Sequence, residues 1–411
     1  MSLGEQMEAI GRAAREASEI LRTSPAEQRS EAIRAIAALI RRRAPEILEA
    51  NAQDVADATA MIDRLTLNDE RIEDMARALD TIADLPDPIG TVLDRWVPPN
   101  GLEISRVRTP IGVIGMIYES RPNVTADAAA ICLRSGNAVI LRSGSEALRS
   151  ALAIGAAIAD ALNDTGLPPG SVQLIPTADR AAVAMMLEGL GGTIDLIIPR
   201  GGRSLVERVT AEARVPVLGH LEGVCHTYVH RSADPAMAAQ IVRNAKLRRV
   251  TVCGATETLL IDRDAAPAML PLIADALGGC ELRGDAQARA IVPMAEATET
   301  DWRTEYLAPV LAVKTVDDID AAIAHIRQFG TGHTEAIIAD DTSVAEYFLG
   351  RVDSAIVLWN ASTQFADGGE FGMGAEIGIA TGRLHARGPV GVEQLTTFKY
   401  VVRGNGQTRP T

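Results

Sequence analysis

The chain has 411 residues, of which 47% are hydrophobic but only 3% aromatic, so it is long enough for two domains with aliphatic cores. Its formal net charge of −14 argues against nucleic acid as a partner, because phosphate binding requires a basic surface. The acidic first residues do not resemble a secretion signal, and no uncharged apolar run of about 18 residues predicts a membrane span. We therefore expect a soluble, cytoplasmic protein that binds neither nucleic acid nor membranes.

The first 90 residues have the pattern of helices. Ser24, Pro25 and Glu27 combine an N-cap serine, a proline at the first helical position and a capping-box glutamate. Ile33, Ile36 and Ile40 then share one helical face. Apolar and polar residues alternate at 102–107, which predicts a β-ribbon outside the main sheet.

From Ile111 onward, short apolar runs alternate with alanine-rich helical stretches. This alternation predicts an α/β fold with doubly wound parallel sheets. A break near 229–231 separates two series of runs and predicts a domain boundary there. The predicted strands lie at 111–117, 137–141, 172–175, 194–198 and 215–218, then at 256–261, 309–313, 335–339 and 354–358.

Four cysteines are widely spaced, and none forms a Cys-x-x-Cys pair. The sequence therefore predicts no metal site and no disulfide framework, but reduced thiols at Cys132, Cys225, Cys253 and Cys280. Cys253 stands directly before a glycine and seven residues after Lys246, one of only three lysines. A buried structural cysteine is the alternative interpretation. Cys225 lies in an apolar strand-like segment, where we expect it to pack in the core.

Several long motifs occur in a fixed order between residues 95 and 405. The motifs are Tyr118–Thr125, Asn137–Ala147, Asp195–Gly202, His220–His226, Asn360–Thr363, Asp367–Gly378 and Leu384–Pro389. Together they resemble the aldehyde dehydrogenase superfamily, and within it they are similar to the gamma-glutamyl phosphate reductase family. Two residues depart from that family's pattern, which has a proline at the position of Val250 and an asparagine at that of Gly254.

The resemblance implies a doubly wound nicotinamide-binding domain, an α/β catalytic domain and a β-arm for oligomerisation. By this resemblance, the NADP-binding domain would span 1–229, and its residues 95–108 would contribute to the arm. The catalytic domain would span 230–355. Residues 356–392 would return to the cofactor domain and close the site, and 393–411 would complete the arm. We also expect a homo-oligomer, either dimer or tetramer, and functional coupling to glutamate 5-kinase.

The implied activity is the NADPH-dependent reduction of L-glutamyl 5-phosphate to L-glutamate 5-semialdehyde and phosphate, the second step of proline biosynthesis. The alternatives are a related aldehyde or acyl-phosphate reductase, or a catalytically silent ligand-binding member. A thiolate suits this chemistry, since sulfur is a strong nucleophile and its thioester is electrophilic. The resemblance makes Cys253 the nucleophile, and Asn123 a donor to the oxyanion. The alternative interpretation of Asn123 is an N-cap for the helix that starts near Val124, and the two roles are compatible.

The resemblance also indicates residues that bind the cofactor. Arg142 and Ser145 favour a 2′-phosphate, and hence NADPH, although Glu146 next to them counts against it. Arg200, Gly201 and Gly202 precede a predicted helix whose N-terminus could bind the pyrophosphate, and a plain surface turn is the alternative. Glu305 matches a glutamate that holds the nicotinamide ribose.

An acidic protein that handles a dianionic substrate must concentrate positive charge locally. Arg121, Lys246 and Arg249 are the candidate cations for the substrate, and solvated surface charge is the alternative for each. Hydrolytic members of the superfamily carry a glutamate that activates water. Here His220 stands at that position and Glu222 follows two residues later, which on a strand would be too far away to replace it. The sequence therefore predicts slow hydrolysis of the thioester.

Overall fold

The computed structural model describes residues 1–409, which form two compact units. Unit 1 contains Met1–Gly219, Met373–Gly378 and the C-terminal segment from Val390, and unit 2 contains His220–Gly372 and Ile379–Pro389. The predicted boundary at 229 is therefore wrong by ten residues, because the strand that ends at Val229 pairs inside unit 2. Most of the predicted return segment 356–392 also belongs to unit 2.

Helices form the N-terminal part of unit 1, as the sequence predicts. Ile33, Ile36 and Ile40 are completely buried, which confirms the predicted helical face. The predicted N-cap is wrong, because the Ser24 hydroxyl donates to the Leu21 carbonyl of the preceding helix instead. The helices of unit 1 are α1 (Leu3–Leu21), α2 (Ala26–Arg42), α3 (Ala44–Asp57), α4 (Ile62–Leu65), α5 (Asp69–Asp84), α6 (Val124–Arg134), α7 (Leu148–Asp164), α8 (Arg180–Leu187) and α9 (Arg203–Glu212).

A four-stranded parallel sheet with the order β5-β4-β3-β6 forms the core of unit 1. From β3 the chain adds β4 and β5 on one side and then β6 on the other, so the winding reverses beside β3. The predicted run at 215–218 forms only an isolated bridge between Val217 and Ile197. The strands are β3 (Val113–Tyr118), β4 (Ala138–Ser143), β5 (Val172–Leu174) and β6 (Leu196–Arg200).

Unit 2 contains a seven-stranded parallel sheet with the order β10-β9-β11-β8-β7-β12-β13. Aliphatic side chains from both faces of this sheet are buried against its helices. The edge strand β10 and its neighbour β9 are short and polar, so the hydrophobic pattern did not predict them. The strands are β7 (Cys225–Val229), β8 (Thr256–Asp262), β9 (Glu281–Gly284), β10 (Ala295–Glu296), β11 (Val310–Val316), β12 (Thr334–Ile338) and β13 (Ile356–Trp359).

Five helices connect these strands, and a small β-pair follows them. The longer predicted strands of the second series, at 256–261, 309–313, 335–339 and 354–358, correspond to β8, β11, β12 and β13. The remaining elements of unit 2 are α10 (Pro235–Leu247), α11 (Ala266–Ala276), α12 (Ala286–Ile291), α13 (Ile319–Phe329), α14 (Thr342–Arg351), β14 (Ile379–Ala380) and β15 (Gly388–Pro389).

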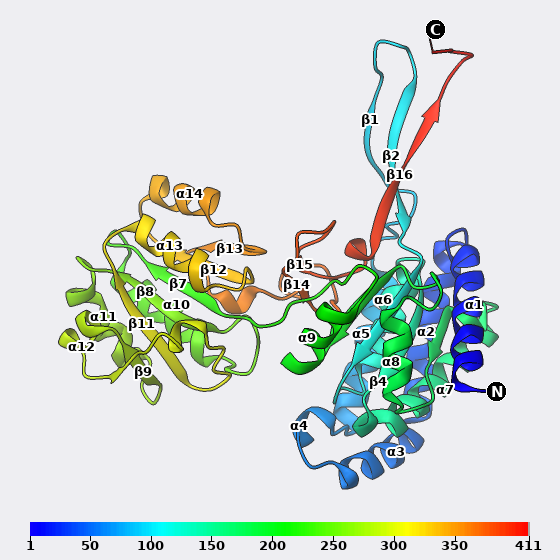
Figure 1. Ribbon diagram of the computed structural model, residues 1–411, viewed down its shortest axis with the longest axis horizontal. Coiled ribbons are helices and arrows are strands. Elements are labelled where there is room, and N and C mark those ends of the chain that lie inside the picture. The colour runs from blue at the N-terminus through cyan, green and yellow to red at the C-terminus, as the bar shows by residue number, and fades with distance from the viewer. Residues whose placement is uncertain (410–411) are drawn as a thin grey trace. The chain divides into compact units, whose positions relative to one another are not determined.

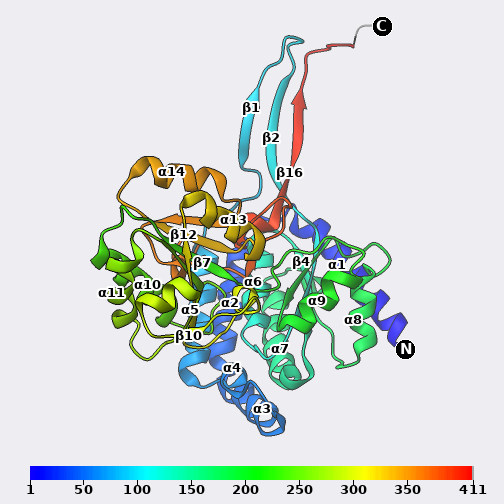
Figure 2. The same cartoon turned by 60° about the vertical axis from the view of Figure 1, so that its left-hand side comes forward.

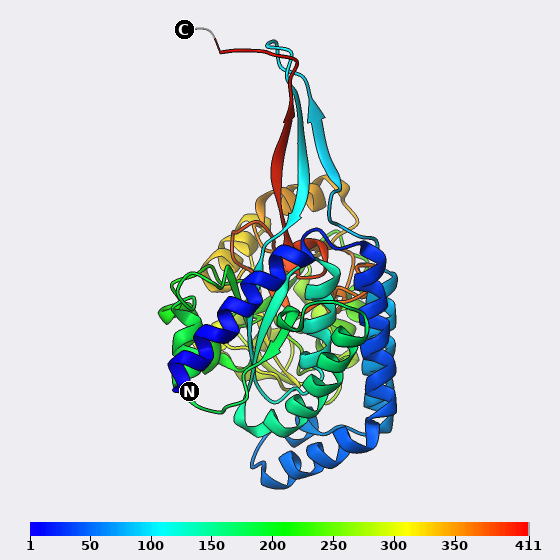
Figure 3. The same ribbon diagram turned by 90° about the vertical axis from the view of Figure 1, so that its right-hand side faces the viewer.

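A separate antiparallel ribbon of three strands extends away from the helices and sheet of unit 1 (Figure 1, Figure 2 and Figure 3). It is formed by β1 (Val92–Trp96), β2 (Glu103–Pro110) and β16 (Thr396–Arg403), and β16 pairs with β2 along its whole length. This confirms that the alternating run at 102–107 and the C-terminal strand lie outside both main sheets. No helix in residues 1–409 has the length and apolar character that crossing a membrane requires.

Candidate functional site

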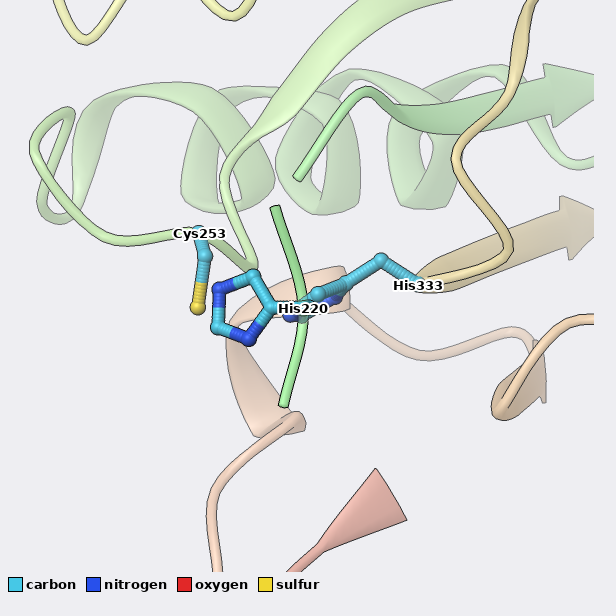
Figure 4. Close-up of side chains that lie close together, drawn as sticks. All are labelled: His220, Cys253 and His333. Carbon is cyan, nitrogen blue, oxygen red and sulfur yellow. The ribbon is translucent and has the colours of Figure 1, made fainter. Parts of the chain in front are cut away.

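Three reactive side chains gather at the amino ends of neighbouring strands in unit 2. Cys253 lies in the turn before β8, His220 in the loop before β7, and His333 directly before β12. Because β8, β7 and β12 are adjacent and parallel, these residues, far apart in the sequence, meet at one edge of the sheet. One sulfur or ring nitrogen from each lies within 4.8 Å of those of the other two. Figure 4 shows the Cys253 sulfur facing the His220 ring.

The turn that carries Cys253 is held by close packing. Cys253 is half-buried against an apolar cluster that includes Ile356 and Ile379. A Cβ atom at Gly223 would lie 2.0 Å from the Cys253 carbonyl oxygen, so only glycine fits there. A Cβ at Gly254 would lie 3.0 Å from the Thr363 carbonyl oxygen. The space at Gly254 is therefore tight for a side chain, and nothing in the structure explains why this chain departs from the asparagine of the family pattern.

Cys225 packs against the turn that carries Cys253 and is hydrogen-bonded to it. Its side chain is completely buried, and its thiol donates to the Cys253 carbonyl at 3.1 Å. Burial raises the pKa of Cys225 far above its usual value, and the nearby Glu335 adds to the rise. Cys225 therefore stays a protonated thiol. Its burial confirms the core-packing interpretation and leaves Cys253 as the nucleophile candidate.

The two histidines are oriented by different partners. Nδ1 of His220 lies 2.7 Å from the Ile379 carbonyl oxygen, which can only accept, so Nδ1 carries the proton and Nε2 a lone pair. His333 is completely buried, and its Nδ1 lies 2.9 Å from the Thr334 hydroxyl. Burial lowers the pKa of His333 well below its usual value, and His220 lowers it further. His333 is therefore a neutral imidazole.

Glu305 lies in the same part of unit 2. It stands in the loop before β11, and its carboxylate accepts the Gly223 N–H at 3.1 Å. Because Gly223 packs directly on the Cys253 carbonyl, Glu305 and Cys253 are joined through this one glycine. The structure therefore brings together two of the residues that the family resemblance singled out.

Lys246 does not present its charge to a substrate. Its side chain is completely buried, forms an ion pair with Glu257 and lies over the Tyr306 ring, 5.6 Å from the centroid. Burial raises the pKa of Glu257 to about 7, while the ammonium of Lys246 opposes the rise. The predicted substrate contact of Lys246 has no support here, because its charge is neutralised inside the protein. Arg249, at the end of α10, is exposed.

In unit 1, polar groups gather where the winding of the sheet reverses, at the carboxyl ends of β3 and β6. This crevice is where open α/β sheets bind ligands. Glu119 follows β3, and its N–H donates to the Arg200 carbonyl. Its carboxylate accepts the Gly202 N–H at 3.1 Å and lies close to Gly201. The pyrophosphate contact at Gly201 and Gly202 stays a prediction, and in this structure the Gly202 N–H at this helix N-terminus donates to the Glu119 carboxylate.

The predicted 2′-phosphate site lies at the end of β4. Arg142 is almost buried and donates to the Ala178 carbonyl at 2.9 Å, but its Nε has no partner. Burial lowers the pKa of Arg142, whereas Glu146 and Glu119 raise it. Ser145 is exposed beside it, and Glu146 is bound to the N–H and hydroxyl of Ser120. An arginine with an unused donor next to an exposed serine fits a phosphorylated ribose, and the bonds to Ser120 hold Glu146 in place.

Asn123 precedes α6 in unit 1 and is exposed. It occupies the N-cap position of α6, as the alternative interpretation predicts, but its side chain caps no backbone N–H, and its amide donates to Asp127 at 2.8 Å. Burial raises the pKa of Asp127 to about 6, against the lowering effects of Asn123 and Arg200. Arg121 lies half-buried in the preceding turn. Asn123 therefore belongs to unit 1, whereas Cys253 belongs to unit 2.

Sequence reasoning missed His333, Gly223 and Glu119. His333 is a single histidine before a predicted strand, and only the order of the strands shows that it reaches Cys253. Gly223 belongs to a recognised motif, but the requirement for glycine depends on the Cys253 carbonyl opposite it. Glu119 stands two residues after the first predicted strand, and this place near a strand end was the one available signal.

Comparison with known proteins shows the family to which the chain belongs. The model of the aldehyde dehydrogenase family matches residues 2–302 and 290–401. A gamma-glutamyl phosphate reductase from Caulobacter sp. strain K31 is 62% identical with full coverage of both chains. One from Caulobacter vibrioides is 63% identical, covering 98% of this chain and 100% of that one. The crystal structure of the Thermotoga maritima gamma-glutamyl phosphate reductase has a TM-score of 0.95 at 46% identity, covering 98% of this chain and 100% of that chain.

An acetylating aldehyde dehydrogenase from Geobacillus thermoglucosidasius shares the fold alone, with a TM-score of 0.69 at 18% identity over 99% of this chain and 98% of that one. Two wound α/β units with a cysteine before a central strand define an oxidoreductase of the aldehyde dehydrogenase class. Within that class, the chain belongs to the gamma-glutamyl phosphate reductase family, whose members reduce glutamyl phosphate in proline biosynthesis.

The contact between Gly223 and the Cys253 carbonyl leads to a first prediction. Gly223→Ala should displace the cysteine turn, and a displacement of about 1 Å in a reacting group costs roughly 100-fold in turnover. The measurement is the rate of glutamyl phosphate reduction together with the rate at which iodoacetamide labels Cys253. Gly350→Ala in α14 is the matched control, because a Cβ there meets no atom within 4 Å. Unchanged turnover in Gly223→Ala would contradict the role given to this contact.

Proposed function

We propose that the protein reduces L-glutamyl 5-phosphate to L-glutamate 5-semialdehyde with NADPH, through a thioester on Cys253. The observation that carries this proposal is the half-buried Cys253 thiol, packed in a rigid turn within reach of two imidazoles. The other three cysteines are less suitable. Burial raises the pKa of Cys132, Cys225 and Cys280, the last of these to about 11, so all three remain thiols near neutral pH.

The first step is the attack of sulfur on the acyl carbon. Nε2 of His220 accepts the thiol proton, because Nδ1 already donates to the Ile379 carbonyl. The C–O bond to the phosphate then breaks, and phosphate leaves with its electron pair. The products of this step are a thioester on Cys253, free phosphate and a protonated His220, which is then a poor base for activating water. This order of events supports slow hydrolysis of the thioester.

Charge on the acyl oxygen needs hydrogen-bond donors as it develops. Asn123 is a suitable donor, because it is exposed at the start of α6 and its amide is oriented by Asp127. One N–H of the amide bonds to Asp127, and the second can point to the substrate. Arg121 and Arg249 are the proposed cations for the carboxylate and phosphate of the substrate. Arg121 is half-buried in unit 1, and Arg249 is exposed in unit 2.

The reduced nicotinamide, when bound, supplies the hydride that converts the thioester to the aldehyde and releases the Cys253 thiolate. Arg142 and Ser145 are proposed to bind the 2′-phosphate, which the unused Nε of Arg142 supports. Glu305 is proposed to hold the nicotinamide ribose. Its bond to the Gly223 N–H gives it a fixed place beside the cysteine turn. Arg200, at the end of β6, is proposed as a second cation that binds the phosphates of the cofactor.

The role of Cys253 is tested by exchanging one thiol at a time. Cys253→Ala should reduce turnover to background, while NADPH still binds with nearly unchanged affinity. Cys280→Ser is the matched control, since this half-buried thiol belongs to the same unit but not to the cluster, and it should keep nearly full activity. Steady-state reduction of glutamyl phosphate and fluorescence titration with NADPH give the two readouts. A Cys253→Ala enzyme with near-normal rates would rule the mechanism out.

Cofactor preference is tested at Arg142. Arg142→Ala should weaken the binding of NADPH by about 10-fold to 100-fold, because one or two hydrogen bonds to a charged group contribute about that much to affinity. The affinity for NADH, which lacks the 2′-phosphate, should change little. Arg12→Ala on the exposed side of α1 is the control. Equal efficiency of the parent enzyme with both cofactors would show that this site does not select NADPH.

We further propose that the β1-β2-β16 ribbon is covered by a second copy of the chain. An exposed strand edge with apolar side chains invites pairing, and natural proteins cover such edges. The phenol of Tyr400 meets the Trp96 ring edge-on, so these side chains form one patch. The apolar residues that are at least 39% exposed on or beside this ribbon are Val92, Leu93, Trp96, Val97, Phe398, Tyr400 and Val402.

Truncation tests this assembly. Removing residues 397–411 deletes most of β16 but keeps the buried Leu395 and Thr396 in unit 1, and it should convert an oligomer to monomers or aggregates. Removing only 404–411 keeps β16 and should leave the oligomer intact. Sedimentation velocity at micromolar concentration measures both. A parent protein that sediments as a monomer would contradict the proposal.

A further inference from the structure

We propose that Zn²⁺ binds the resting enzyme at His220, Cys253 and His333. One ligand atom from each side chain lies within 4.8 Å of the other two. A thiolate and two imidazoles are ligands that zinc prefers, and three protein ligands with one open position are typical of reactive zinc sites. In residues 1–409 this is the one group of three or more histidines, cysteines or carboxylates with such spacing.

The geometry requires only a small contraction. Zinc bonds of about 2.3 Å to sulfur and 2.0–2.1 Å to nitrogen, in tetrahedral arrangement, place ligand atoms roughly 3.3–3.6 Å apart. The observed separations of at most 4.8 Å therefore need to shorten by at most about 1.5 Å. The side chains of His220 and Cys253 can supply this change by rotating towards His333, which is fixed at the start of β12, so the packed turn that carries Cys253 stays in place.

Each histidine already has the second partner that metal-bound histidines usually have. The Ile379 carbonyl holds the Nδ1 proton of His220, which leaves Nε2 as the metal-binding atom. Nδ1 of His333 lies 2.9 Å from the Thr334 hydroxyl, which can accept its proton and so leave Nε2 for the metal. Nε2 of His333 is buried and has no hydrogen-bond partner. A buried polar atom without a partner costs about 1–3 kcal/mol, and coordination to zinc would remove this cost.

Cys225 does not compete for the metal. Its S–H donates to the Cys253 carbonyl, and its side chain is completely buried beneath the turn. Zinc would therefore meet a single thiolate, that of Cys253. The half-buried position of Cys253 also leaves a route for the ion to enter and for water to occupy the fourth position.

Zinc at this site would inhibit the enzyme, and this consequence rests on the role proposed for Cys253. The sulfur lone pair that attacks the acyl carbon would be shared with the metal, and Nε2 of His220 could not accept a proton. Glutamyl phosphate and Zn²⁺ would therefore exclude each other. Zinc would also shield the thiol from alkylation, an effect that does not depend on catalysis.

Cobalt serves as a spectroscopic probe of the full-length, metal-free protein. Co²⁺ should bind with a stoichiometry of about one per chain and give a sulfur-to-cobalt charge-transfer band in the near ultraviolet, which Zn²⁺ should abolish. Cys253→Ser should lose the band, and Cys280→Ser, the matched thiol control, should keep it. His220→Gln and His333→Gln should each weaken Zn²⁺ binding by at least about 10-fold. His220, in a loop, is the safer exchange if the buried His333 variant does not fold.

Alkylation gives an independent test within one sample. Zn²⁺ should slow the labelling of Cys253 by iodoacetamide at least about 10-fold and leave the slower labelling of Cys280 unchanged, as measured by peptide mass spectrometry. Activity should fall with Zn²⁺ and return with a chelator. A cobalt band that persists in Cys253→Ser, or equal labelling of Cys253 with and without zinc, would overturn the proposal. An inactive parent enzyme that still shows the band and the protection would refute the proposed function but not the metal site.

Discussion

The parallel pairing of β8, β7 and β12 is the constraint on which the site in unit 2 depends. Buried polar contacts hold these strands together near their amino ends. The Glu335 carboxylate on β12 accepts both the backbone N–H of His226 on β7, at 2.8 Å, and a ring nitrogen proton of the same histidine, at 2.9 Å. The hydroxyl of Thr227 on β7 lies 2.7 Å from that of Thr256 on β8, which in turn reaches Thr363 at 3.0 Å. Loss of any of these partners would leave a buried polar group unsatisfied.

This arrangement has a direct chemical consequence. Residues that precede three adjacent parallel strands are close in space whatever their distance in the sequence. The reactive cysteine therefore sits at the amino ends of the strands of unit 2. In unit 1, by contrast, the polar groups proposed for the cofactor lie at the carboxyl ends of the sheet. The two sets of strand ends offer different chemistry. At the amino ends in unit 2, a thiol with imidazoles suits acyl transfer, and at the carboxyl ends in unit 1, backbone amides and an arginine suit phosphate binding.

Much of the fold could be predicted from the sequence, because apolar runs such as 256–261 and 335–339 are long, β-branched and separated by helical stretches. The site was harder to predict. Cys253, Asn123 and Glu305 could be named from family motifs, but strand order, which no local pattern contains, decides that His333 reaches Cys253. The charge of Lys246 is visible in the sequence, whereas its burial against Glu257 is not. Likewise, Gly202 is visible in the sequence, but the hydrogen bond from its N–H to the distant Glu119 carboxylate is not.

The central claim is that Cys253 carries the acyl group and that the thioester persists, with little hydrolysis, until hydride reduces it. The most direct test is to mix the enzyme with glutamyl phosphate in the absence of NADPH and to follow released phosphate. The account predicts a burst of about one equivalent per chain, with an acyl adduct on Cys253 in the mass spectrum and little further release. Continued phosphate release well above the spontaneous breakdown of the substrate, or an adduct on another residue, would contradict it.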